Sequence, residues 1–319
     1  MTERESFPAR QSTFLGPGLA ALTANTPWAE AAAAFELYMT NQEYSQHTIR
    51  SFRSDLRLAG EYLGAGTAIG RVSTADLNRF LNYLLHERDV PCSPKSYARR
   101  VTTLKVFFKW LHRNGVLPED VAEPVIQRSV PTPLPEILDD DEIARARAVT
   151  LAMWQAEKPD PRPHLLLNLL LATAMKKAEC MGIRLKHIQR DEPGGAYVQI
   201  RYENPARKLK ERKLALPADL LPVLDDYLEQ YKPQDVLFPC TPRNLEYVLS
   251  DVAERADIHK KVKKGISFEM LRWTSAALDY REGDDPTRVR QKLGISEVTW
   301  QDTEKKLRQL VGAEQEEQD

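Results

Sequence analysis

Residues 165–179 read LLLNLLLATAMKKAE, and this stretch decides how the second half of the chain folds. Leu165 to Ala172 is an apolar run interrupted only by Asn168, a pattern that is typical of a helix buried on all sides. The run falls far short of the roughly 18 apolar residues that cross a bilayer. We therefore expect a buried helix at the centre of a domain, and no membrane partner.

A hairpin with a basic tip is predicted downstream of this helix. Tyr197–Ile200 and Lys213–Leu216 have strand patterns, and the polar residues Glu203-Asn204-Pro205 between them favour a turn. Residues 201–213 contain six basic residues against two glutamates. Further helices are predicted to begin at Asp139–Glu142 and to cover Leu220–Leu228, Leu245–Ala253, Met270–Leu278 and Val289–Leu293.

Upstream of the apolar run, four segments repeat apolar residues every three to four positions, which predicts four amphipathic helices. The last of them has Ser93 as a candidate N-cap, Pro94 in the first helical position and Gly115 as a stop signal. The four segments are Trp28–Met39, Gln46–Leu63, Leu77–Leu84 and Ser93–Asn114.

The domain organisation follows from length and proline content. A chain of 319 residues is long enough for about two domains, and five prolines between Pro118 and Pro135 exclude a continuous helix there. We predict a flexible arm (1–26), a helical domain (27–117), a proline-rich linker (118–135), an α+β domain (136–311) and an acidic tail (312–319). The fold class is mainly α with a small antiparallel β-sheet.

Charge is segregated along a chain whose net charge is only −1. Lys95 to Arg113 contains six basic residues and no acid, so a basic surface is compatible with a neutral protein. The three cysteines, Cys92, Cys180 and Cys240, are widely spaced and predict reduced thiols. We expect no metal and no cofactor. The N-terminus lacks the pattern of a signal peptide, so a cytoplasmic location is expected, on the nucleoid if DNA is bound.

Five motifs, in this order along the chain, resemble the tyrosine recombinase, or phage integrase, family and its Xer-like members. The resemblance implies a SAM-like core-binding domain followed by an integrase-type catalytic-fold domain. It also implies a chemistry in which cations surround a scissile phosphate and a tyrosine hydroxyl attacks it. The motifs lie in Ser45–Leu56, Leu104–Pro118, Leu170–Glu179, Lys210–Pro217 and Met270–Gly294.

Most of the catalytic positions implied by the resemblance hold other residues in this chain, which indicates a catalytically degenerate member. Lys176 replaces the first arginine and so lacks the two-pronged guanidinium that grips two phosphate oxygens. Arg272 retains the second arginine, or alternatively serves as a structural ion-pair residue with Glu179 or Glu269. The remaining positions fall on Arg207, with Lys208 beside it, for the hairpin lysine, on Glu269 and Ile295 for the two hydrogen-bond donors, and on Glu304 for the nucleophile.

The missing nucleophile does not depend on the alignment, because Tyr280 is the last tyrosine and 39 residues follow it. All six histidines precede Phe268. An active, divergent recombinase would need Tyr280, Ser296, Thr299 or Thr303 as a substitute nucleophile. The tryptophans at positions 110, 273 and 300 are interpreted as packing residues.

The main hypothesis is therefore a DNA-binding protein without cleavage activity, with a regulatory, architectural or accessory role in recombination. A protein-interaction module is a further alternative. The expected partners are duplex DNA and a second copy or an active recombinase, reached through Leu307 and Leu310-Val311 of a C-terminal helix. The predicted DNA-binding residues are Arg50, Arg53, Lys95, Arg99, Arg100, Lys105, Lys109, Lys208, Lys210, Arg212, Lys263, Lys264 and Arg272.

Overall fold

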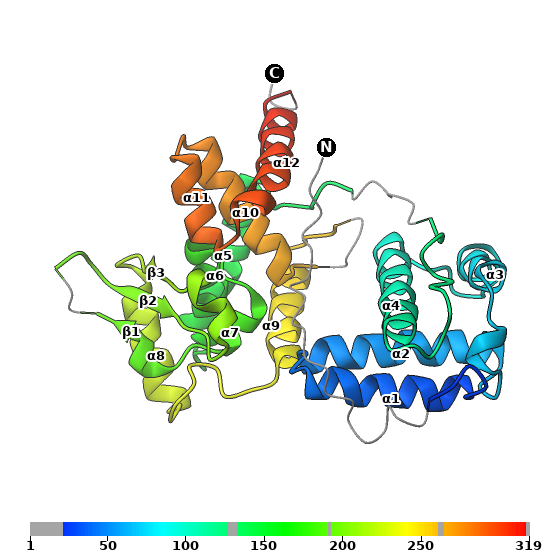
Figure 1. Cartoon of the computed structure of the whole chain (residues 1–319). Helices are drawn as coiled ribbons and strands as arrows, with labels where there is room; N and C mark the ends of the chain where they lie inside the picture. Colours follow the sequence, from blue (N-terminus) through cyan, green and yellow to red (C-terminus); the bar gives the residue numbers. More distant parts are fainter. Residues whose placement is uncertain (1–21, 127–132, 191–192, 261–264, 317–319) are drawn as a thin grey trace. The chain divides into compact units, whose positions relative to one another are not determined.

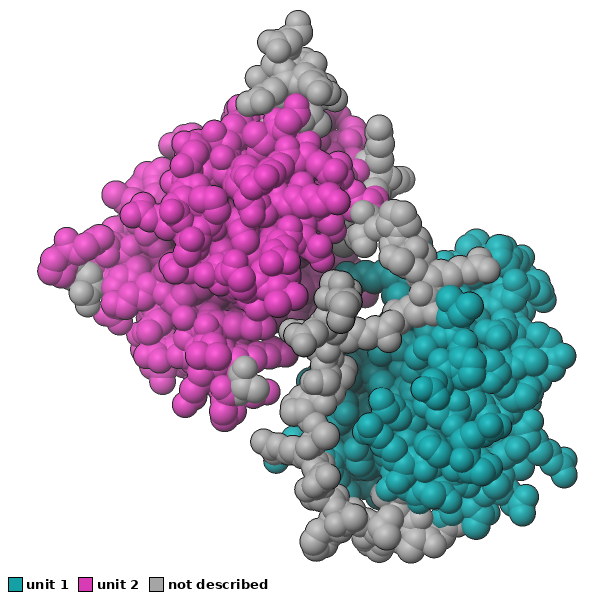
Figure 2. Space-filling model, turned by 45° about the horizontal axis from the view of Figure 1, so that its top comes forward, with its two compact units in different colours: residues 1–132 teal, residues 133–319 magenta. Residues whose placement is uncertain are grey.

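The computed structural model describes residues 22–126, 133–190, 193–260 and 265–316. The chain forms two compact units, residues 1–132 and 133–319 (Figure 2). Helices dominate both units, and the second also contains a small antiparallel sheet (Figure 1). The fold class predicted from the sequence is confirmed.

The first unit consists of the four predicted helices, and serine side chains begin three of them. Ser45 and Ser93 accept hydrogen bonds from the backbone N–H groups of Thr48 and Ser96, and Ser73 forms a capping box with Asp76. The helices are α1 (Trp28–Asn41), α2 (Gln46–Leu63), α3 (Thr74–His86) and α4 (Pro94–Arg113).

Aromatic side chains fill the core of the first unit. Trp28, Phe35 and Phe107 are almost completely buried, and the ring centroids of Phe107 lie 5.4 Å from those of both Trp28 and Phe35. The indole N–H of Trp28 donates to the carbonyl oxygen of Leu56 at 2.9 Å. Trp110 is buried beside these rings, as expected of a packing residue. The core therefore locks α4 against α1 and α2.

The proline-rich segment predicted as a linker begins inside the first unit. Ala122 and Val125 are buried in its core, and Thr74 donates a hydrogen bond to the carbonyl oxygen of Val121 at 2.7 Å. The chain therefore packs onto the first unit beyond residue 117. Apolar side chains between the prolines explain this difference from the sequence prediction, which rested on proline content alone.

The second unit is built around α6 (Arg162–Thr173), whose six leucines are all at most 5% exposed. The predicted buried central helix is therefore confirmed. Helices α5 (Asp140–Trp154), α8 (Leu220–Tyr231), α9 (Pro242–Arg255) and α10 (Phe268–Arg281) pack against it. The short helix α7 (Lys177–Met181) follows α6 directly.

The sheet of the second unit has the antiparallel order β1-β2-β3, with strands β1 (Ile188–Gln189), β2 (Tyr197–Ile200) and β3 (Arg212–Ala215). In the β2–β3 hairpin, Tyr197 pairs with Ala215 and Ile200 pairs with Arg212. The connection between these strands contains a 3₁₀ helix, η3 (Pro205–Lys210), where the sequence predicted a turn.

Helices α10, α11 (Pro286–Leu293) and α12 (Glu297–Glu316) enclose a separate apolar cluster. Trp300 and Leu307 of α12 are buried there against Ala276, Ala277 and Val289, and Leu310 of α12 is also buried. The apolar face of α12 is therefore covered within its own unit, beside α10 and α11 (Figure 1).

Candidate functional site

A buried ion pair joins α7 to β3. The two terminal nitrogens of Arg212 donate to the two carboxylate oxygens of Glu179, at 3.1 Å from Nη1 to Oε1 and 2.9 Å from Nη2 to Oε2. The Glu179 side chain is 1% exposed and the Arg212 side chain 10%. The hydroxyl of Tyr202 and the backbone N–H of Lys176 donate to the same carboxylate. Because each oxygen has two donors, the buried charge of Glu179 is well satisfied.

The pKa of Glu179 lies below its ordinary value. Burial acts to raise this pKa, but the hydrogen bonds and charge of Arg212, followed by the hydroxyl of Tyr202, outweigh burial. A lowered carboxyl pKa contributes stability above the ordinary pKa, and this contribution is lost as the pH falls through the lowered value.

We therefore expect the unfolding free energy of the native protein to fall more steeply below about pH 4 than that of Glu179→Gln, which has no carboxylate to titrate. Denaturant titrations between about pH 3 and pH 7, followed by circular dichroism, measure both profiles. Parallel profiles would show that Glu179 makes no contribution to the acid sensitivity of the fold.

The same guanidinium holds the end of α11. Nε of Arg212 donates to the carbonyl oxygen of Lys292 at 2.7 Å. Gly294 follows in the left-handed region with φ 59°, and a Cβ atom added there would lie 2.5 Å from Nη1 of Arg212. Only glycine combines this backbone conformation with so close an approach. Arg212, which the sequence placed among the DNA contacts, is thus bound within the protein.

Arg272 of α10 is buried, at 7% exposure, and binds backbone carbonyl groups. Its guanidinium donates to the carbonyl oxygens of Ala174, at the end of α6, and of Leu293, at the end of α11. The sequence offered Glu179 or Glu269 as ion-pair partners. In the described structure the hydrogen bonds of Arg272 go to these carbonyl groups, and Glu269 accepts from the indole N–H of Trp273 at 3.0 Å.

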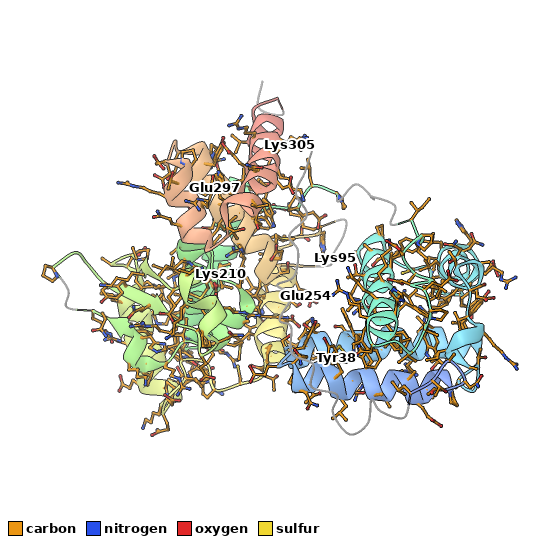
Figure 3. All side chains as sticks on the ribbon, viewed as in Figure 1. Tyr38, Lys95, Lys210, Glu254, Glu297 and Lys305 are labelled. Carbon is orange, nitrogen blue, oxygen red and sulfur yellow. The ribbon has the colours of Figure 1, made fainter. Side chains whose placement is uncertain are left out.

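Lys176 lies at the N-terminus of α7, half-buried beside other cations. Burial, followed by the charge of Arg272, lowers the pKa of its ammonium group, and Lys210 and Arg212 lower it further. We call Lys176, Lys210, Arg212 and Arg272 the cation cluster; Lys210 is its most exposed member and is labelled in Figure 3. Two of its members, Arg212 and Arg272, already donate to Glu179 and to backbone carbonyl groups.

Glu304, at the position where the family resemblance implies a nucleophile, connects α12 to α10. Its carboxylate accepts from Nη2 of Arg308 at 2.7 Å and from the hydroxyl of Tyr280 at 3.4 Å. Nε of Arg308 also donates to the Tyr280 hydroxyl at 3.1 Å. We call these three residues the 304 strut. The phenol of Tyr280 is therefore engaged with two neighbours.

The other hydroxyl groups near this position form hydrogen bonds within the first turns of α12. The Oγ of Ser296 accepts from the backbone N–H of Thr299 at 3.3 Å and lies 2.9 Å from its hydroxyl. The hydroxyl of Thr303 donates to the carbonyl oxygen of Thr299 at 2.9 Å. Ile295, beside them, packs against the apolar cluster of α10–α12. All of these hydroxyls have local helix-capping or helix-backbone roles.

Some basic residues of the first unit form ion pairs or hydrogen bonds within the protein, and others are exposed to solvent. Nη2 of Arg99 lies 2.8 Å and Nε of Arg100 lies 3.5 Å from the buried carboxylate of Asp55, and burial raises the pKa of that carboxyl. Arg53 pairs with Glu36 at 3.2 Å. Lys105 donates to the carbonyl oxygen of residue 123 at 3.2 Å. Arg50, Lys95 and Lys109, all predicted to contact DNA, are exposed on α2 and α4, as is Arg113 at the end of α4.

The hairpin tip of the second unit exposes Arg207, Lys208 and Lys210, all on η3. Lys263 and Lys264, which were also predicted to contact DNA, lie outside the described residues.

Within the described part of the chain, no group of three or more His, Cys, Asp or Glu side chains could hold a metal ion. None of the described helices is both long and apolar enough to traverse a membrane.

Comparison with known proteins finds similarity to tyrosine recombinases. Residues 33–115 match the phage integrase N-terminal SAM-like domain. The chain is 28% identical over 293 residues to tyrosine recombinase XerC of Anoxybacillus flavithermus, in an alignment covering 83% of this chain and 88% of the relative. Over most of its length the chain is therefore similar to tyrosine recombinases. Tyrosine recombinase XerD of Listeria innocua is 23% identical over 80% of this chain and 86% of the relative.

Solved structures of tyrosine recombinases share the fold. XerH bound to a palindromic difH substrate in a post-cleavage complex has a TM-score of 0.67 at 15% identity, covering 92% of this chain and 96% of that chain. A lambda integrase dimer bound to a COC' core site also has a TM-score of 0.67, at 14% identity over 86% of this chain and 93% of the other. The SAM-like domain and the integrase catalytic fold implied by the sequence motifs are therefore confirmed.

Proposed function

We propose that this tyrosine recombinase homologue binds duplex DNA and does not cleave it. The observation that carries the proposal is the absence of any tyrosine after Tyr280, combined with the engagement of Glu304 in the 304 strut. A carboxylate paired with Arg308 is a poor nucleophile, and attack on phosphate would give a labile mixed anhydride in place of a phosphotyrosine.

The general acid and the hydrogen-bond donors of the family chemistry are also not retained at their expected positions. Glu269 is an anion where a donor would face phosphate, and Ile295 has no donor at all. Arg207, at the position of the hairpin lysine, is a poor proton donor, and Lys208 could take that role only with a shift of one residue. Stabilisation of a phosphate by the cation cluster without these groups supports binding without turnover.

Duplex DNA is the partner that the distribution of cations supports. The cation cluster holds four basic residues, and further exposed basic residues lie on α2, α4 and η3. Contacts from lysine and arginine to backbone phosphates supply most of the affinity in such proteins. The XerH and lambda integrase structures that share the fold are complexes with their DNA sites.

A protein that binds DNA without cleaving it fits an accessory or architectural role. Leu307 and Leu310, which the sequence offered for contact with a second copy or an active recombinase, are buried within the same unit. In this conformation α12 does not present these two leucines to a neighbour, and only Val311 of the predicted docking residues is partly exposed. We therefore propose that the chain binds DNA without docking α12 on another subunit.

The proposal is tested by binding followed by denaturing electrophoresis on a nicked duplex, which traps a covalent intermediate if one forms. We expect a shifted complex on the native gel and no protein–DNA adduct after denaturation. The variants Tyr280→Phe, Ser296→Ala, Thr299→Ala and Thr303→Ala should bind as the native chain does. A covalent adduct that one of these variants abolishes would establish a divergent active recombinase, and a missing shift at low salt would exclude DNA as the partner.

A further inference from the structure

The tip of the β2–β3 hairpin exposes an apolar side chain completely. Leu209 of η3 is 100% exposed, whereas the other exposed large hydrophobic side chains in the described ranges are 37–77% exposed. Single exposed apolar residues are common on protein surfaces. Leu209 differs because three cations, Arg207, Lys208 and Lys210, surround it in the sequence of the same short helix.

The hairpin stem fixes the position of this tip. Glu211 binds the opposite strand end twice, through Arg201 at 2.8 Å and through the backbone N–H of Tyr202 at 3.0 Å. Within the tip, the backbone N–H of Glu211 donates to the carbonyl oxygen of Lys208 at 3.0 Å. Arg212, directly after the tip, is anchored on Glu179. Leu209 therefore projects from a turn that is hydrogen-bonded at its base.

The acidic residues of the hairpin are already paired with cations outside the tip. Glu211 pairs with Arg201, and Glu203 lies 3.5 Å from Arg184. The cations next to Leu209 consequently give the tip a positive surface around an apolar centre. A groove of duplex DNA is complementary to this arrangement, because phosphates line both of its edges and stacked bases form its floor.

We propose that Leu209 inserts between base pairs of bound duplex DNA from the minor groove, while Arg207, Lys208 and Lys210 hold the flanking phosphates. Leucine is among the side chains that act as such wedges, and insertion unstacks one step and kinks the duplex. This inference rests on the proposed DNA binding and adds that the bound DNA is bent.

Bending is measured with the full-length chain and a duplex of about 30 base pairs that carries a donor and an acceptor fluorophore at its two ends. At about 50 mM salt and saturating protein, the native chain is expected to raise the energy transfer between the ends. Leu209→Ala should lose most of this rise and bind about tenfold more weakly, because the apolar contact is gone. The salt dependence of binding should stay unchanged, because no charge is removed.

Two variants serve as matched controls. Lys208→Ala should reduce the slope of log K against log salt by about 1 while the saturated complex stays bent. Val298→Ala, which truncates another side chain that is 66% exposed, should alter neither bending nor affinity. Because Leu209 is fully exposed, Leu209→Ala is expected to unfold at the temperature of the native chain.

The outcomes distinguish the insertion of Leu209, which we call the wedge, from the proposed binding of duplex DNA. If the native chain binds but does not bend the duplex, or if Leu209→Ala bends it equally well, the wedge is refuted and the binding function stands. If the native chain does not bind duplex DNA at all, both proposals fall. A Leu209→Ala variant that binds an acidic protein more weakly but DNA equally well would assign the tip to a protein partner and also refute the wedge.

Discussion

Replacing Arg212 with alanine is expected to lower the free energy of unfolding of the second unit by about 3–5 kcal/mol. The reason is the carboxylate of Glu179, which is 1% exposed and would lose both hydrogen bonds from its cation. The variant would also lose the contact that holds the carbonyl oxygen of Lys292. Urea titration followed by far-ultraviolet circular dichroism measures the change.

Arg201→Ala is the control for this prediction. Arg201 also pairs with a glutamate in the same hairpin, but its side chain is 52% exposed, so its loss should have a much smaller effect. Arg212→Lys should fall between the two, because it keeps the charge and loses the two-pronged geometry. Equal stability losses for Arg201→Ala and Arg212→Ala would mean that burial does not increase the contribution of the Glu179–Arg212 pair to the free energy of unfolding.

The affinity for duplex DNA is expected to fall about 10³-fold between 50 mM and 200 mM salt. We take six exposed basic residues on α2, α4 and η3 as the phosphate contacts, and each contact releases about one counterion. Fluorescence anisotropy of a labelled duplex at several salt concentrations gives the slope. These six residues are Arg50, Lys95, Lys109, Arg207, Lys208 and Lys210.

Single variants identify which unit contributes to the slope. Lys95→Ala should reduce its magnitude by about 0.9. Arg57→Ala is the matched control, because Arg57 is 71% exposed on α2 but pairs with Glu61 and lies outside the predicted set. A slope near zero for the native chain, or equal effects of the two variants, would contradict a phosphate-binding role for α4.

Much of the fold could be predicted because its signals are local. The period of apolar residues located the four helices of the first unit, and Ser93 and Pro94 marked where α4 begins. The leucine run located the centre of the second unit. Strand β1 was not predicted, because two residues, Ile188 and Gln189, are too few to show an alternating pattern.

The roles of individual cations could be predicted less well, because they depend on partners far away in the sequence. Arg99 and Arg100 lie in a stretch without acids, yet Asp55, more than 40 residues earlier, faces both of them. Arg212 likewise pairs with Glu179, 33 residues earlier. A local count of charges cannot detect such pairs. The family motifs predicted Lys176 and Arg272 for one site, and the charge of Arg272 does lower the pKa of Lys176.

If the chain does not cleave DNA, as we propose, position 304 also limits how it could acquire strand cleavage. A tyrosine there would leave Arg308 and Tyr280 without the carboxylate that both now share. The same substitution that supplied an attacking oxygen would therefore loosen the last helix from α10. The side chain at position 304 cannot both attack a phosphate and hold α12 against α10. A gain of strand cleavage therefore requires at least one compensating change elsewhere on α12.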